Sequence, residues 1–337
     1  RHRCEYSMNT RALAAQILIR VQDEGAYSNV VLPLATADLD PRDRAFVYNL
    51  VTGALRRQRH TATMIEAACS RQLSELDPEV RAVLQVAAAE LITDTKSVVY
   101  ATVNEAVEAI KQLDRPKAAS FVNAVLRRLV GEVNSAGEMS QAVEWSVPDW
   151  LAQRLQLDHG AQEAAKLLVG LRREGPQVAI RVRPGGKPPE GAIAAEGIAD
   201  AYYVSAPHQT PHAVIADAAS TAVGHAVAAQ PGQRVLDMAA APGGKTIHLW
   251  DQLESHGHLV AMDSHRRRLR SARRRLTAIG VRPSWVRADG RRSPFADASF
   301  DTVLLDAPCT GLGTLRRRPE IAMRLESGSP ERLAVRQ

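Results

Sequence analysis

Cysteine is scarce in this chain of 337 residues, which contains only Cys4, Cys69 and Cys309. The three cysteines are far apart and odd in number, a pattern typical of neither a disulfide framework nor a zinc cluster. The sequence therefore predicts no metal site. It favours a reducing compartment, and we expect the cytoplasm.

Long apolar runs are missing as well, because no stretch reaches the roughly 18 apolar residues that a transmembrane helix needs. The N-terminus also has no signal-peptide pattern. No membrane partner is expected. The first residue is Arg1 and the first helical pattern opens at Met8, so residues 1–7 are interpreted as preceding the first domain.

Positive charge exceeds negative charge only mildly. Lysine and arginine number 43 against 37 aspartates and glutamates, which gives a formal net charge of +6 and a pI of about 9.5. This balance suits a polyanionic partner, yet many proteins carry as much for solubility. Charge alone leaves both interpretations open.

Apolar residues recur at helical spacing throughout residues 8–131, for example at Leu13, Ile17 and Val21. This spacing predicts an all-α domain. Asp40 and Asp77 each precede a proline and are predicted to cap helices. The polar residues 131–146 are interpreted as a linker.

The periodicity changes twice after the linker. Residues 147–230 combine two helical patterns with an alternating strand at 178–182, which predicts a small α+β bridging domain. From residue 231 to 337, strands alternate with helices, which predicts an α/β, Rossmann-like domain with a parallel sheet. The four expected strands of that domain cover residues 234–238, 258–263, 284–289 and 300–306.

Small residues followed by Lys245 come after the first of these strands, at positions 239–245, here named the glycine loop. Such a turn lets backbone N–H groups and a helix N-terminus approach a ligand closely. Its spacing is not that of a P-loop. Asp263 and Asp289 end the next two strands, where a nucleotide site places a carboxylate on ribose hydroxyls. The alternative is that both only form caps or turns.

The fourth strand leads into Asp306-Ala307-Pro308-Cys309. A lone cysteine is usually a small buried apolar residue. This one follows a proline at the expected mouth of the site, and the arginines behind it would favour a thiolate. We therefore interpret Cys309 as functional.

The glycine loop, Asp263, Asp289 and the Pro-Cys turn with its following Arg-Arg-x-Pro-Glu-Ile together resemble the Sun family of RNA 5-methylcytosine methyltransferases. The match is with the RsmB-like type, in which a NusB-like domain is fused to a class I methyltransferase acting on 16S ribosomal RNA. Four upstream segments resemble that NusB-like domain, at residues 9–12, 43–46, 103–107 and 121–128.

The resemblance implies S-adenosylmethionine as the cofactor. The positions it implies for cofactor contact are Ala239, Ala240, Ala241, Pro242, Gly243, Gly244, Lys245, Asp263, Asp289 and Asp306. It implies catalytic roles for Lys245, Asp306 and Cys309. In the family a cysteine of a later Thr-Cys motif attacks cytosine C6, and the Pro-Cys cysteine assists product release.

No Thr-Cys pair occurs in this sequence. We therefore expect the catalytic domain to be truncated within its sheet, with Cys309 in the release role or as a surrogate nucleophile. The resulting hypothesis is methylation of cytosine C5 in RNA, with 16S ribosomal RNA as the favoured substrate. The alternative is a catalytically incomplete fragment that binds RNA and cofactor without turnover. The Pro-Cys turn and the NusB-like domain disfavour a protein or small-molecule methyltransferase.

Seven arginines lie between residues 266 and 275. RNA contact is predicted there for Arg267, Arg270 and Arg274, and at the end of the helical domain for Arg127 and Arg128. The alternative is an exposed amphipathic helix that packs through Leu269 and its apolar neighbours. No partner other than RNA is expected, and we expect a monomer.

Overall fold

The computed structural model describes residues 9–93, 99–132, 141–172, 178–205 and 210–337. The chain forms two compact units. The helical unit combines Arg1–Gly175 with Thr310–Arg332, and the sheet unit combines Pro176–Cys309 with Leu333–Gln337. Cys4 and Met8 lie outside the described residues.

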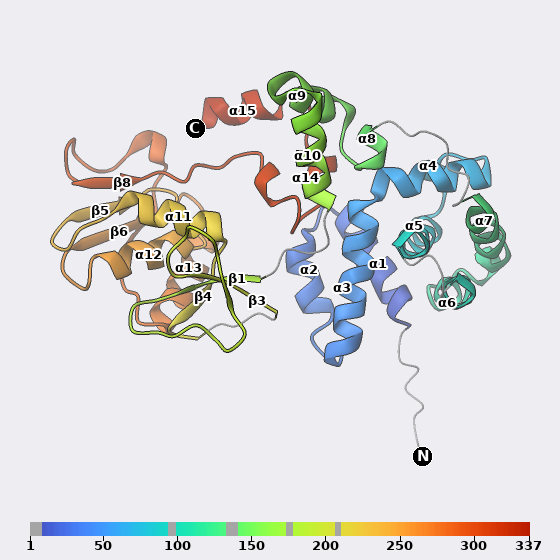
Figure 1. The fold of residues 1–337 in the computed structure, drawn as a ribbon, viewed down its shortest axis with the longest axis horizontal. Coiled ribbons are helices and arrows are strands. Elements are labelled where there is room, and N and C mark those ends of the chain that lie inside the picture. Colours follow the sequence, from blue (N-terminus) through green and yellow to red (C-terminus); the bar gives the residue numbers. More distant parts are fainter. Residues whose placement is uncertain (1–8, 94–98, 133–140, 173–177, 206–209) are drawn as a thin grey trace, which may run out of the picture. The chain divides into compact units, whose positions relative to one another are not determined.

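The first part of the helical unit confirms the predicted all-α fold (Figure 1). Asp40 accepts hydrogen bonds from the backbone N–H groups of Arg42 and Asp43 and so caps one helix, as predicted. The α-helices up to the expected linker are α1 (Thr10–Gln22), α2 (Ser28–Ala35), α3 (Pro41–Arg56), α4 (Gln58–Cys69), α5 (Pro78–Thr93), α6 (Val99–Gln112) and α7 (Ala119–Glu132). Single turns of 3-10 helix, η1 (Leu73–Glu75) and η2 (Pro116–Ala118), lie between them.

The expected linker at 131–146 is partly helical, because α8 (Gln141–Glu144) lies inside it; residues 133–140 of the linker lie outside the described residues. After it come α9 (Asp149–His159) and α10 (Ala161–Arg172). The later segment of this unit contains the 3-10 turn η4 (Leu312–Thr314) and α14 (Glu320–Arg324), and α15 (Ser329–Arg336) begins in it.

A small antiparallel sheet opens the sheet unit, with strand order β2-β3-β1-β4. Its strands are β1 (Val178–Val182), β2 (Ile193–Ala194), β3 (Ala201–Val204) and β4 (Ala213–Ile215). The bounds of β1 agree with the predicted strand. Helix α11 (Ala218–Val227) follows, and the side chain of Asp217 caps it by accepting the N–H of Ala219.

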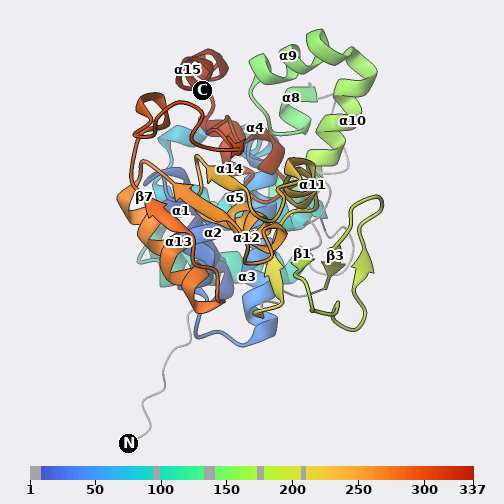
Figure 2. The ribbon, with the colours of Figure 1, turned by 90° about the vertical axis from the view of Figure 1, so that its left-hand side faces the viewer.

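The second sheet is parallel, with order β7-β6-β5-β8, and confirms the predicted Rossmann-like fold (Figures 1 and 2). Its elements are β5 (Arg234–Asp237), α12 (Gly244–Gln252), β6 (His258–Met262), α13 (Arg266–Ala278), β7 (Ser284–Val286), the 3-10 turn η3 (Gly290–Arg292) and β8 (Thr302–Leu304). Leu249 of α12 and Leu253, which follows that helix, pack with Val235 and Leu259 on one face. The opposite face packs against Phe295 and Phe300.

The third strand of this sheet is shorter than predicted. Strand β7 ends at Val286 and does not extend to Asp289. The carboxylate of Asp289 instead accepts the backbone N–H of Arg291 and caps η3. Asp289 therefore belongs to the turn after the strand and not to the strand itself.

A buried ionic cluster, here named the arginine clamp, joins the small sheet to α12. Arg181 and Arg183 of the β1 segment both donate to the carboxylate of Asp251. The side chains of Arg181 and Asp251 are 3% and 6% exposed. Burial and the nearby charge of Arg181 lower the pKa of His248 to about 3, so its ring is neutral at physiological pH. The clamp therefore ties the C-terminal end of α12 to the small sheet.

Candidate active site

The glycine loop connects the end of β5 to the start of α12. Asp237 ends β5 with 1% exposure and accepts a hydrogen bond of 2.6 Å from Oγ1 of Thr246. Burial raises the pKa of Asp237 to about 6, against the opposing effect of that hydrogen bond. Gly243 has φ +100°, and a Cβ there would lie 2.8 Å from Cδ1 of Leu276, so only glycine fits.

Two neighbouring elements hold the glycine loop in place. Asp263, which follows β6 and is 5% exposed, accepts the backbone N–H groups of Ala241 (3.2 Å) and His265 (2.8 Å). From α13, the guanidinium groups of Arg268 and Arg275 donate to the carbonyls of Ala241 and Pro242. The loop is therefore fixed on both its N–H and its carbonyl side. The anchoring by Arg268 and Arg275 was not predicted from the sequence.

The strand order reverses at β5, since β6 and β7 extend on one side and β8 lies on the other. In open parallel sheets, ligands bind beyond the carboxyl ends of the strands at such a reversal. Here Nζ of Lys245, in the first turn of α12, donates to Oδ2 of Asp306 after β8 at 2.6 Å. Asp306 remains 56% exposed, so its second oxygen is open to a ligand.

The other predicted residues are placed as follows. Cys309 is exposed, three positions after Asp306. Asp289 is half-buried and is paired with its neighbour Arg291 at 2.6 Å. The side-chain and backbone hydrogen bonds from Arg291 lower the pKa of Asp289 to about 2. The structure thus brings Asp263 to the glycine loop and Lys245 to Asp306, whereas Asp289 is held by Arg291.

Helix α13 exposes all seven of its arginines and buries Leu269, Ala272 and Leu276. Arg266, Arg267 and Arg270 line a cavity of about 200 Å³, and Arg274 is exposed.

In the helical unit, Arg127 donates to Asn123 one turn earlier. Arg128 donates to the carbonyl of Ala68 and so ties α7 to α4. Among the described residues, no group of His, Cys, Asp or Glu side chains is arranged to hold a metal ion. In the same residues no helix is long and apolar enough to span a bilayer.

Comparison with known proteins identifies the family. The ribosomal RNA small subunit methyltransferase B of Thermus thermophilus is 34% identical over 339 residues, covering 97% of this chain and 77% of the relative. The enzyme of the same name from Xanthomonas campestris pv. campestris is 33% identical and covers 93% of this chain and 76% of the relative. The chain belongs to the ribosomal RNA small subunit methyltransferase B family.

Two family models match this RsmB-family chain in the two regions that the sequence resemblance indicated. The NusB family matches residues 8–131, and the 16S rRNA methyltransferase RsmB/F family matches residues 225–337. The crystal structure of PH0851 has a TM-score of 0.76 at 21% identity, over 98% of this chain and 81% of that one. That likeness shows a shared fold.

Proposed function

We propose that this chain methylates C5 of cytosine in small-subunit ribosomal RNA with S-adenosylmethionine as the methyl donor. The observation that carries the proposal is the exposed thiol of Cys309, three residues beyond the Lys245–Asp306 pair at the strand-order reversal. Methyl transfer to oxygen or nitrogen needs no thiol. Cytosine C5 is a poor nucleophile, and a thiolate that adds to C6 activates it.

The residues around the glycine loop fit the proposed cofactor. The loop offers small side chains, and its N-cap Gly243 supplies no side-chain acceptor to the start of α12, so the helix end can receive a carboxylate. Asp263 is the carboxylate proposed for the ribose hydroxyls. When bound there, S-adenosylmethionine supplies an electrophilic methyl group. Lys245 holds Asp306, which can accept a hydrogen bond from the cytosine amino group.

The test is methyl transfer from labelled S-adenosylmethionine to unmodified small-subunit ribosomal RNA, followed by digestion to nucleosides. We expect the label to elute with 5-methylcytidine. An RNA in which every cytidine already carries the 5-methyl group is the matched control and should receive no label. Label in another nucleoside would overturn the assignment to C5.

Binding without turnover is the second candidate function. It is favoured by one sequence observation: Cys309 is the single cysteine between residues 225 and 337, and no Thr-Cys pair accompanies it. In that case, calorimetry would detect binding of S-adenosylmethionine and a gel shift would detect binding of RNA. The transfer assay would show no label in RNA.

Helix α13 is the proposed RNA contact in the sheet unit. Replacing Arg267, Arg270 and Arg274 with glutamine should make the log–log salt dependence of RNA affinity shallower by about 2, since each phosphate contact contributes about 0.7. S-adenosylmethionine affinity should not change, because the loop anchors Arg268 and Arg275 remain.

A control variant removes the same charge from arginines already paired with carboxylates. These are Arg154, Arg234 and Arg332, which contact Asp158, Asp301 and Glu326. The control should keep the parent slope. If the salt dependence of RNA affinity has the same slope in both triple variants, α13 does not contact RNA and is an exposed helix surface.

A further inference from the structure

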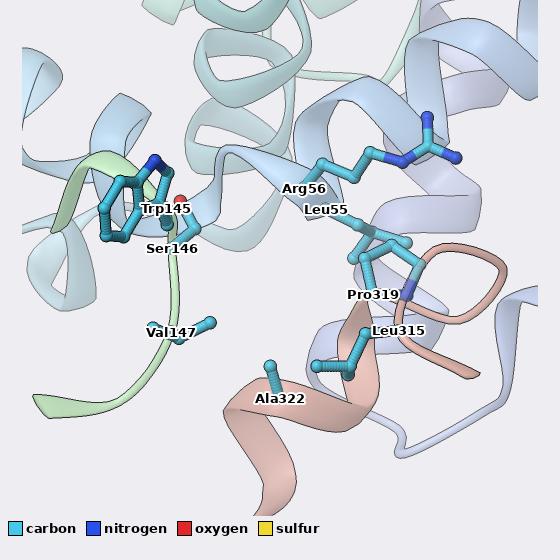
Figure 3. A pocket seen from close by; sticks show the side chains of 8 residues that line it. All are labelled: Leu55, Arg56, Trp145, Ser146, Val147, Leu315, Pro319 and Ala322. Atoms are coloured by element: carbon cyan, nitrogen blue, oxygen red, sulfur yellow. The ribbon is translucent and has the colours of Figure 1, made fainter. Parts of the chain in front are cut away.

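The segment Thr310–Arg332 belongs to the helical unit and contains three consecutive arginines at positions 316–318. Its apolar side chains share one buried cluster with residues before α9; the cluster includes Leu315, Ile321, Ala322, Trp145 and Val147. Figure 3 shows part of this packing, around a cavity of only about 20 Å³. The arginine run therefore lies on a segment that is packed against the helical unit.

The segment is also anchored beside α2 by Glu320. The carboxylate of Glu320 accepts hydrogen bonds from the backbone N–H (3.1 Å) and Oγ (3.0 and 3.1 Å) of Ser28. Glu320 is 2% exposed and Ser28 is 1% exposed. Ser28 begins α2, whose N-cap residue Tyr27 makes no side-chain cap. Glu320 thus caps α2, and its charge is buried next to the residue that follows Tyr27.

Tyr27 is an exposed aromatic residue with a guanidinium beside its ring. It is 47% exposed. The guanidinium carbon of Arg324 lies 4.8 Å from the ring centroid of Tyr27, within the range of a cation–π contact. The same guanidinium donates to the carbonyls of Val21 (2.7 Å) and Ala26 (2.5 Å). Arg324 is therefore held in place beside the ring by the helical unit itself.

The arginine run brings further positive charge to Tyr27. The guanidinium carbon of Arg318 lies 6.0 Å from the ring centroid, and its Nη2 donates to Oγ1 of Thr314 at 3.2 Å. Arg316 has an exposed side chain, while its backbone carbonyl accepts a hydrogen bond of 2.9 Å from Arg56. These contacts fix the backbone and one guanidinium of the run before any ligand binds.

The two carboxylates that precede Tyr27 in the sequence are each paired with another arginine. Asp23 contacts Arg81 at 2.7 Å, and Glu24 contacts Arg20 at 3.9 Å. These two negative charges are therefore offset locally. The arginines beside the ring favour an anionic partner.

We propose that the ring of Tyr27 and the arginines beside it bind single-stranded RNA on the helical unit. This surface, here named the tyrosine site, consists of Tyr27, Arg316, Arg318 and Arg324. An unpaired base stacks on the open part of the ring, and the guanidinium groups bind the neighbouring phosphates. The inference rests on the proposed RNA substrate and adds to it a contact that recognises an unpaired base.

The first experiment uses the parent chain and a single-stranded RNA of about 12 nucleotides with 4-thiouridine in place of uridine. Ultraviolet crosslinking and peptide mass spectrometry should locate this RNA on the peptide that contains Tyr27. A duplex of the same sequence should give no such crosslink, because its bases stay stacked on one another. Crosslinks confined to other peptides overturn the proposal.

The second experiment measures the affinity of Tyr27→Leu for the same single strand. Binding should weaken about tenfold because a stacked base is lost, while the log–log salt slope stays constant because tyrosine neutralises no phosphate. A strand of equal length without bases should bind the parent and Tyr27→Leu equally. The matched control is Tyr100→Leu, at a tyrosine of α6 that is 75% exposed, and it should behave as the parent. Parent-like RNA affinity in Tyr27→Leu overturns the proposal.

The third experiment replaces Arg316 and Arg318 together with glutamine. The log–log salt slope for the single strand should become shallower by about 1.4, since each phosphate contact contributes about 0.7. The control replaces Arg154 and Arg332, two ion-paired arginines of the same unit, and should keep the parent slope. Equal slopes in the two double variants contradict the assignment of phosphates to the arginine run.

Failure of the tyrosine site and failure of the proposed methylation give different results. None of the three measurements needs methyl transfer, so they decide the tyrosine site even if the parent chain labels no RNA. If Tyr27→Leu binds and methylates RNA as the parent does, the tyrosine site fails and the proposed function stands. If the parent binds the strand without bases as tightly as the RNA, the surface is a general anion site and the proposal is wrong.

Discussion

Cys309→Ala is expected to lower methyl transfer to RNA by at least about a hundredfold, because either role proposed for this thiol lies on the route to product. The rate is measured with labelled S-adenosylmethionine under multiple-turnover conditions, so that a defect in product release also lowers it. The matched control is Cys69→Ala, at a half-buried cysteine that ends α4 in the helical unit. The control should retain the parent rate.

RNA containing 5-fluorocytidine separates the two roles of Cys309, because fluorine at C5 blocks the final elimination and preserves the protein–RNA bond. If Cys309 is the nucleophile, mass spectrometry will find the RNA on Cys309, and Cys309→Ala will form no adduct. If Cys309 acts only in release, no RNA will be found on Cys309 of the parent chain. Full activity in Cys309→Ala would refute both roles.

Asp251→Asn should lower the opening free energy of the sheet unit by about 3–5 kcal/mol, since it leaves a buried guanidinium without its counter-charge. The side chain of Arg181 is 3% exposed and contacts Asp251 directly, whereas Arg183 also donates to the carbonyls of Pro211 and Ile279. The measurement is hydrogen exchange of peptides covering β1 and α12, which report opening of this unit.

Asp301→Asn is the control, because Asp301 forms a solvent-exposed pair with Arg234 in the same unit. Exchange in that variant should match the parent, as expected for an exposed ion pair. Adding Arg181→Met to Asp251→Asn should restore much of the protection, because no unpaired buried charge then remains. A loss of less than about 1 kcal/mol in Asp251→Asn would contradict the clamp's assigned role.

The periodicity of apolar residues predicted the all-α domain and the parallel sheet, but it did not reveal the shortest strands. The all-α domain and the parallel strands produce long or repeated apolar patterns, and both are present. Strand β2 has two residues and β4 three, too few for alternation to be visible. The predicted end of β7 was wrong, because Asp289 lies in the turn that leads into η3 and not in the strand.

Part of the candidate site could also be predicted from the sequence, where its residues are close together along the chain. The glycine loop and Asp263 lie within one strand–turn–helix–strand unit, so their proximity follows from local order. The anchors Arg268 and Arg275 were read only as part of an arginine-rich surface, since spacing does not show which side faces the loop. The contact between Ser28 and Glu320 joins residues 292 positions apart, and no local pattern signals it.

That long separation bears on how the protein is made. The apolar core of α1 to α7 is encoded in the first part of the chain and can pack as soon as those helices are synthesised. The backbone N–H of Ser28, at the N-terminus of α2, can bond to the Glu320 carboxylate only after the ribosome has moved 292 positions along the chain. At about 5–20 residues per second, this delay lasts roughly 15–60 seconds. During synthesis, the N-terminus of α2 therefore gains its cap from Glu320 only after the segment with the Pro-Cys turn has been made.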